Sequence, residues 1–149
     1  MFLSLEDQAV TEEYLDQGYV IRPVKDRQAL DWIRSLLVAQ SHKCLHISPD
    51  DGSDVWLNQI HERVPVSDLN AFRLEIINSI NAEVDLRLRY FELAKPWLEP
   101  LVGNELAMQL RINLSIQMPR DDSSLLPVHA DTWSGDSPYE VVVWVPMVD

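Results

Sequence analysis

The sequence is poor in cysteine and in positive charge, and it has no long hydrophobic run. Its single cysteine, Cys44, excludes an internal disulfide and fits a reducing compartment. Twelve Lys and Arg residues stand against 24 Asp and Glu residues, and the resulting net charge of -12 repels phosphate backbones and anionic membrane surfaces. No basic leader opens the chain, and no apolar stretch approaches the roughly 18 residues of a membrane span. We therefore expect a cytoplasmic protein that binds neither nucleic acid nor membranes.

A chain of 149 residues suits one domain, and we expect residues 1–149 to form it. Residues 1–104 show mainly helical periodicity. The segment SLEDQAVTEEYLDQ predicts a short helix that stops at Gly18, with a strand from Tyr19 to Pro23. Asp26 is suited to cap a second helix over RQALDWIRSLLVAQ. The polar stretch from Ser41 to Val66 is typical of a long, ordered loop.

Two further helices are expected before the helical part ends at Gly103. Ser67 is suited to cap the first of these, whose apolar face comprises Leu69, Phe72, Ile76, Ile77 and Ile80. The second covers EVDLRLRYFELAK, with its inward positions at Val84, Leu88 and Phe91. Pro96 should interrupt that helix, since proline lacks the backbone N–H that a helix interior uses.

Residues 105–149 change to a period of two, which is typical of strands. LAMQLRINLSIQMP alternates apolar and polar side chains, and its polar residues either face solvent or line a polar interior. A turn, a short strand over LLPVHAD, a loop and a β-branched strand over EVVVWVPMV follow. Helices followed by consecutive strands predict an α+β fold with an antiparallel sheet or barrel.

His129 and Asp131 are two residues apart at the end of the short predicted strand. On extended backbone, residues two apart point to the same face, so the two side chains could share one ligand. Two His residues and one carboxylate suit an Fe(II) centre that keeps positions open for a cosubstrate and O₂. The alternative is a surface turn in which Asp131 accepts a hydrogen bond.

Both ends of the chain resemble the phytanoyl-CoA dioxygenase-like Fe(II)/2-oxoglutarate oxygenases. The segments that carry the resemblance are TEEYLDQGYVIRPVKDRQALDWIRSLL and LPVHADTWSGDSPYEVVVWVPMVD, of which HAD and VVVWVPMVD are the most specific parts. The chain is most similar to members from bacterial surface-carbohydrate gene clusters. The resemblance implies N-terminal helices packed on a double-stranded β-helix, a jelly-roll barrel like that of the cupins.

The same resemblance implies a function and a set of site residues. It predicts an oxidoreductase that uses Fe(II), O₂ and 2-oxoglutarate to hydroxylate a small molecule, such as a carbohydrate or sugar nucleotide. His129 and Asp131 would be iron ligands, and Gln117 and Trp144 would contact 2-oxoglutarate. In the substrate pocket we expect Trp133 to stack on a ring, with Arg111 and Asn113 as polar contacts from the long strand.

The family's second metal-binding His and its 2-oxoglutarate-binding Arg would fall after Asp149, so the barrel is expected to be incomplete. This leaves an alternative function: a truncated, inactive barrel that acts as a binding or assembly module and associates through an open sheet edge. A cupin-like hydrolase or isomerase would need more His residues than this segment has.

The remaining His residues give weaker candidates. His42, Cys44 and His46 are spaced so that they could bind a metal, but they stand at the end of a helix or in a loop. His61 is either a residue of the substrate pocket or a polar surface residue, and we favour the surface position.

Overall fold

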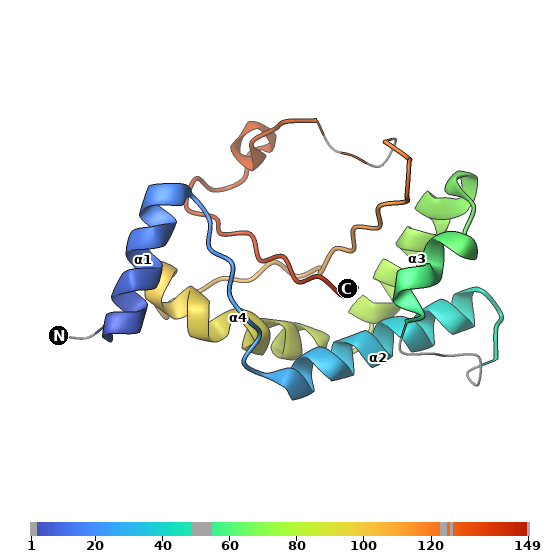
Figure 1. The fold of residues 1–149 in the computed structure, drawn as a ribbon, viewed down its shortest axis with the longest axis horizontal. Coiled ribbons are helices and arrows are strands. Elements are labelled where there is room, and N and C mark those ends of the chain that lie inside the picture. Colours follow the sequence, from blue (N-terminus) through green and yellow to red (C-terminus); the bar gives the residue numbers. More distant parts are fainter. Residues whose placement is uncertain (1–2, 49–54, 123–124, 126, 149) are drawn as a thin grey trace. The chain divides into compact units, whose positions relative to one another are not determined.

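The computed structural model describes residues 3–48, 55–122, 125 and 127–148. Its elements, in chain order, are α1 (Leu5–Gln17), α2 (Arg27–Cys44), η2 (Leu57–Glu62), η3 (Val66–Asp68), α3 (Leu69–Asn81), α4 (Leu86–Val102) and η4 (Asp131–Ser134), where η denotes a 3-10 helix (Figure 1). No residue in these described ranges belongs to a strand. The expected α+β fold with a jelly-roll barrel is therefore wrong for the described chain.

Contacts divide the chain into two compact units that interleave along the sequence. Unit 1 comprises Met1–Ser35 and Glu83–Ile112, and unit 2 comprises Leu36–Ala82 and Asn113–Asp149. The helix α2 begins in unit 1 and ends in unit 2. The second half of the sequence therefore contributes to both units.

Helix α1 of unit 1 begins and ends as its sequence predicts. Ser4 and Asp7 form a reciprocal capping box at its start, and Gly18 ends it in the left-handed conformation with a φ of 79°. The hydrogen bonds with Ser4 hold the pKa of the Asp7 carboxyl below its usual range. Both ends of α1 were thus readable from local sequence.

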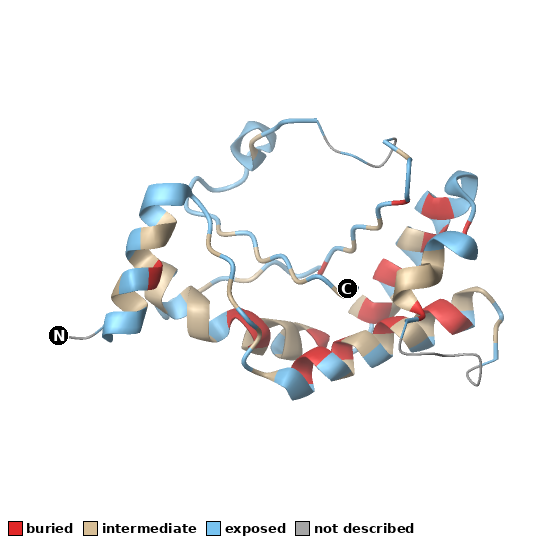
Figure 2. Cartoon of the chain, viewed as in Figure 1, coloured by how far each residue is buried: buried red, intermediate tan, exposed pale blue. Residues whose placement is uncertain are grey.

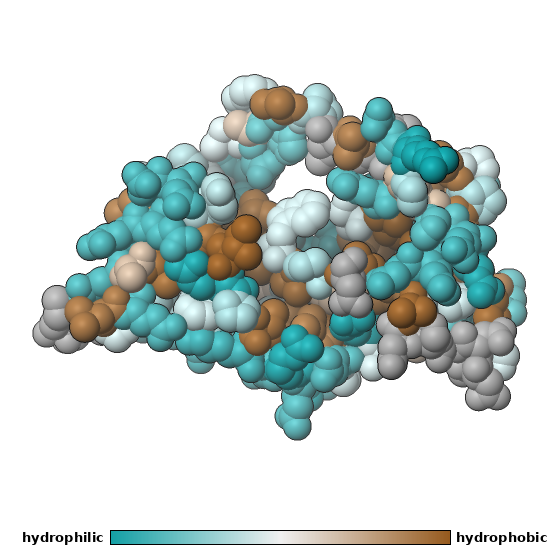
Figure 3. All heavy atoms as spheres, viewed as in Figure 1, coloured by the Kyte–Doolittle hydropathy of each residue, from teal (hydrophilic) through white to brown (hydrophobic). Residues whose placement is uncertain are grey.

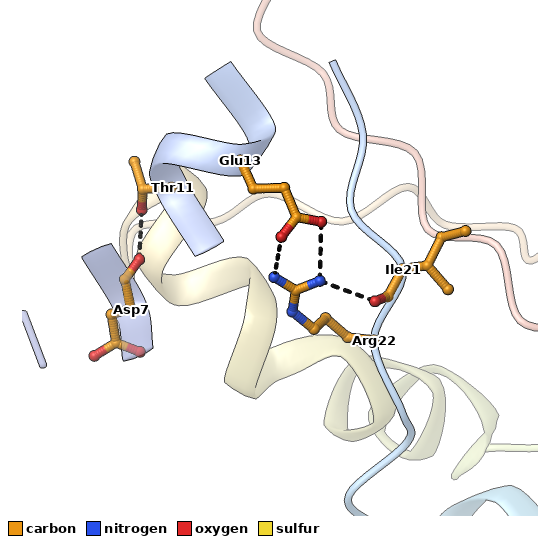
Figure 4. Close-up of polar contacts among 5 residues, drawn as sticks. All are labelled: Asp7, Thr11, Glu13, Ile21 and Arg22. Atoms are coloured by element: carbon orange, nitrogen blue, oxygen red, sulfur yellow. Dashed lines mark hydrogen bonds and ion pairs between the residues drawn. The ribbon is translucent and has the colours of Figure 1, made fainter. Parts of the chain in front are cut away.

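The chain after α1 is extended, and its side chains fasten it to the helices of unit 1. The Arg22 guanidinium donates to both carboxylate oxygens of Glu13, at 3.1 and 2.6 Å, and to the backbone oxygen of Ile21 (Figure 4). The Arg22 hydrogen bonds hold the pKa of the Glu13 carboxyl below its ordinary value. The expected strand from Tyr19 to Pro23 is extended backbone without a ladder.

Helix α4 of unit 1 continues through Pro96 and Pro100, so the predicted interruption at Pro96 is wrong. Tertiary contacts hold the helix between the two prolines, because the indole N–H of Trp97 donates to the backbone oxygen of Pro23 and the Lys25 ammonium lies 4.0 Å from its ring. Helix α1 also packs on α4, where the Thr11 hydroxyl donates to the backbone oxygen of Pro100. These contacts offset the lost backbone hydrogen bonds.

The inward face predicted for α4 is also wrong. Val84 is 94 % exposed and precedes the helix, and Leu88 is exposed within it. The buried residues of α4 are instead Leu86, Leu93 and Ala94. The helix starts later than the pattern indicated, and its buried face is displaced from the predicted one.

Helix α3 supplies much of the core of unit 2. Its five predicted apolar positions are all buried (Figure 2), namely Leu69, Phe72, Ile76, Ile77 and Ile80. The predicted cap at Ser67 is wrong, since the 3-10 turn η3 precedes α3 and the Ser67 hydroxyl donates to Asp68. Here the hydrophobic periodicity was a better guide than the capping residue.

The loop predicted from Ser41 to Val66 is wrong at both ends, because α2 continues to Cys44 and η2 and η3 begin at Leu57 and Val66. Residues 49–54 of this loop lie outside the described residues. The Asp26 cap of α2 is confirmed, with the Asp26 carboxylate accepting from the Ala29 N–H at 2.9 Å. In unit 2 the α2 residue His42 is buried edge-on against Trp56, with ring centroids 4.2 Å apart. An interior aromatic contact thus extends the helix beyond its predicted end.

The segments predicted as long strands are extended but form no ladder. Along the first, Ile112 and Met118 are buried while Asn113, Ser115 and Gln117 are exposed, as a period of two requires. A bend at Leu110 leaves this residue 81 % exposed although its pattern placed it on the apolar face. Alternation sets which side chains turn inward, but a strand also needs a partner for its hydrogen bonds.

None of the helices in the described part of the chain is both long enough and apolar enough to cross a bilayer.

Candidate metal centre

The predicted ligands His129 and Asp131 lie in unit 2, where extended chain turns into the short helix η4. Ala130 between them has extended backbone angles, and Asp131 is the first residue of η4. The turn is closed by backbone hydrogen bonds from Trp133 to Ala130 and from Asp136 to Asp131. Gly135 follows with a φ of 97°, which favours glycine. The backbone around the pair is thus fixed by local hydrogen bonds.

The two side chains converge. His129 Nε2 lies 3.5 Å from Asp131 Oδ1, and each side chain is about half exposed, at 48 and 47 %. Metal-to-ligand bonds of about 2.0–2.2 Å allow one cation to contact both atoms at this separation. The pair can therefore supply one nitrogen and one carboxylate oxygen to the same ion.

A backbone carbonyl orients the imidazole. His129 Nδ1 lies 2.7 Å from the Pro127 oxygen, and a carbonyl oxygen can only accept, so Nδ1 carries the proton. The lone pair of a neutral ring is then on Nε2, the nitrogen that faces Asp131. Metal-binding His residues commonly use the second ring nitrogen in this way. The sequence offered no signal for this contact beyond Pro127 itself.

An ion pair is the alternative account of the same geometry. A protonated His129 would attract the Asp131 carboxylate at this distance. Ion pairs as exposed as this one contribute little to stability, so folding alone gives a weak reason for the arrangement.

The close contacts described above for the His129 and Asp131 side chains involve none of the other predicted site residues. Trp133, within η4, is 77 % exposed, and Trp144 is 73 % exposed on the last extended segment. Gln117 and Asn113 are exposed on the long extended segment of unit 2, while Arg111 belongs to unit 1. Of the predicted residues, the structure brings His129 and Asp131 within reach of each other.

A third ligand is missing from the described chain, where no group of three or more His, Cys, Asp or Glu side chains is arranged to hold a metal ion. The alternative at His42, Cys44 and His46 is accordingly not assembled. Burial, and then the hydrogen bond and charge of Glu75, raise the pKa of the Cys44 thiol to about 11. A thiol that resists deprotonation is a poor metal ligand and a poor nucleophile.

One hollow in unit 2 was not anticipated from the sequence. It has a volume of about 280 Å³ and is lined by His61, Val64, Pro65, Val66, Met118 and Pro119. The His61 side chain lines this hollow and is 38 % exposed, 3.9 Å from Glu62. Residues from two distant parts of the sequence form the wall, which is why no local pattern indicated it.

Comparison with known proteins identifies no relative, since the chain matches no family model, no curated protein and no solved structure.

Proposed function

We propose that His129 and Asp131 are two protein ligands of a mononuclear Fe(II) centre, and that the chain serves a 2-oxoglutarate-dependent oxygenase acting on a small molecule. The observation that carries the proposal is the convergence of His129 Nε2 and Asp131 Oδ1 at 3.5 Å, with Nδ1 held by the Pro127 oxygen. The resemblance of the HAD and VVVWVPMVD segments to oxygenases supports the choice of iron.

The residues of this chain have distinct tasks in the proposal. The Pro127 carbonyl keeps the proton on Nδ1 of His129, so that Nε2 presents its lone pair to the ion. Asp131 contributes a negative charge that offsets part of the charge of a divalent cation. When bound with 2-oxoglutarate and O₂, Fe(II) supplies the chemistry for hydroxylating a C–H bond.

His129 and Asp131 supply part of the ligand set that an Fe(II) centre of this kind needs. One imidazole and one carboxylate are two members of the triad that such iron centres use, and positions for small molecules remain open. The third protein ligand is not among the described residues near this pair. It must come from residues outside the described ranges or from another chain. The jelly-roll barrel has no place in this proposal.

Anaerobic titration with Fe(II) in the presence of 2-oxoglutarate tests the proposal. Chelation of the cosubstrate by bound iron should produce a weak visible charge-transfer band. We expect His129→Ala and Asp131→Ala to abolish the band and His61→Ala, a matched control in the same unit, to retain it. Equilibrium dialysis with Fe(II) alone gives a readout that does not depend on activity.

Two results would contradict the proposal. If the protein retains no Fe(II) with or without 2-oxoglutarate, the pair is an ion pair on the surface. If Fe(II) is retained equally by the wild type and by His129→Ala, the metal lies elsewhere.

A further inference from the structure

The last extended segment exposes an apolar face. Val142, Trp144 and Val148 are 55, 73 and 48 % exposed, and we call these three residues the apolar ridge. They stand at even spacings, so they share one face of the extended backbone over about 20 Å. The odd-numbered residues of the segment, Val141, Val143, Val145 and Met147, are half-buried, whereas Pro146 on the ridge side is exposed, as the alternating colours of this segment in Figure 2 show.

The ridge differs from ordinary surface hydrophobic residues because it lies in a segment without charge. No Asp, Glu, Lys or Arg occurs from Val141 to Val148. Hydrophilic residues are spread widely over the molecular face drawn in Figure 3, and the chain as a whole carries a net charge of -12. A contiguous apolar line on a strongly charged protein is typical of an interaction surface.

We propose that the occupant of the ridge is a second copy of this chain, packed ridge to ridge about a two-fold axis with Trp144 near its centre. Two copies that carry -12 each repel one another, and the charge-free segment is where they can approach at the lowest electrostatic cost. A two-fold contact uses the same patch on both chains, so an apolar ridge is complementary to itself.

A basic partner protein fits this surface less well. Charge would draw such a partner to carboxylates, and the ridge offers none between Val141 and Val148. The side chains of the ridge instead favour burial against apolar groups, and a large aromatic residue at the centre is the usual dominant contact of such an interface. This inference is independent of the metal pair, since His129 and Asp131 lie outside the ridge.

Sedimentation velocity over a range of protein concentrations tests the inference. We expect reversible conversion from a species of 17.2 kDa to one of twice that mass. Trp144→Ser should weaken the association at least about tenfold, because the central aromatic contact is lost. Trp133→Ser is the matched control, since Trp133 is equally exposed but outside the ridge, and it should leave the association unchanged. Far-ultraviolet circular dichroism should show equal helix content in both variants.

The dependence of association on salt distinguishes a second copy of the chain from a basic partner protein. Raising salt from about 0.01 to 1 M shortens the screening length from about 30 to 3 Å and so reduces the repulsion between like-charged copies. Self-association through the ridge should therefore strengthen with salt, whereas recruitment by opposite charge would weaken.

A species that stays at 17.2 kDa at every concentration would overturn the inference. So would a mass that rises beyond two copies without limit, or equal weakening by Trp133→Ser and Trp144→Ser. His129→Ala should leave the association intact, so a failure here and a failure of the metal proposal are distinguishable.

Discussion

The helices and the extended segments of this chain were predicted from equally clear patterns, yet helices are present where they were predicted and strands are not. Helix α3 buries all five of its predicted apolar positions. The extended segment of residues 105–118 shows its predicted alternation of exposure, except at Leu110, without becoming a strand. A helix satisfies its backbone hydrogen bonds within its own sequence, whereas a strand depends on a second segment. Periodicity therefore predicts helices more completely than it predicts sheets.

Shortening an apolar side chain to alanine should give the largest difference in stability between helix α3 and the extended segment of residues 105–118. Ile76 in α3 is 1 % exposed, so Ile76→Ala should lower the free energy of unfolding by about 2–5 kcal/mol through lost burial and a cavity. Leu110→Ala on the extended segment should change it by less than about 0.5 kcal/mol, since Leu110 is 81 % exposed. Urea unfolding followed by circular dichroism measures both. Comparable losses in the two variants would show that the extended segment is packed.

Proline substitution tests the hydrogen bonding of each region. Arg73→Pro falls inside α3 and should cost about 3 kcal/mol, because it removes a helical hydrogen bond and adds a steric clash. Ser115→Pro falls on extended chain outside any ladder, where proline is compatible with the backbone. Thermal unfolding should show a large decrease in Tm for the first variant only. A similar decrease for Ser115→Pro would indicate that residue 115 belongs to a sheet.

Substitutions at helix caps should change the free energy of unfolding by less, and Asp26 and Ser67 allow a true cap to be compared with a predicted one. Asp26→Ala should destabilise α2 by about 1 kcal/mol, because the Asp26 carboxylate accepts the Ala29 N–H. Asp26→Asn keeps an acceptor and should cost less. Ser67→Ala should be close to neutral, since Ser67 bonds Asp68 and caps no helix. If Ser67→Ala costs as much as Asp26→Ala, the cap predicted from the sequence is present in solution.

The half-buried Cys44 thiol gives an effect that is confined to alkaline pH. The folded pKa of Cys44 is about 11 against an ordinary value of 9.0, so the folded state holds the proton more tightly. The stability that this contributes is fully present below about pH 9 and is lost as the pH rises through about 11. Alkylation rates measured against pH should show slow reaction at pH 8, and Glu75→Gln should lower the apparent pKa. A midpoint near 9 in the folded protein would contradict this.

The sequence predicted those features whose causes are local. The Gly18 stop, the Asp26 cap and the apolar face of α3 depend on residues a few positions apart. The course of α4 through Pro96 depends on Trp97 and Pro23, which are far apart in the sequence. The absence of a ladder in the extended segments is likewise a matter of distant partners. A local sequence pattern could therefore predict neither the course of α4 nor the missing ladder.

The candidate site divides in the same way. The approach of His129 to Asp131 follows from their spacing and was predicted. The positions of Gln117 and Trp144 relative to a cosubstrate, and of Trp133 relative to a substrate, would depend on a barrel, and the described chain has none. The hollow beside His61 joins Val64–Val66 to Met118–Pro119, and no local signal connects those segments.

Amide hydrogen exchange on the dilute protein tests the central contrast most directly. The account predicts slow exchange for peptides from α3 and α4 and much faster exchange for residues 113–118 and 144–148, because the helices close their own hydrogen bonds. Raising the protein concentration should slow exchange in residues 140–148 if copies pair through the apolar ridge. Protection of residues 113–118 equal to that of α3 at low concentration would contradict the account, because it would reveal a sheet.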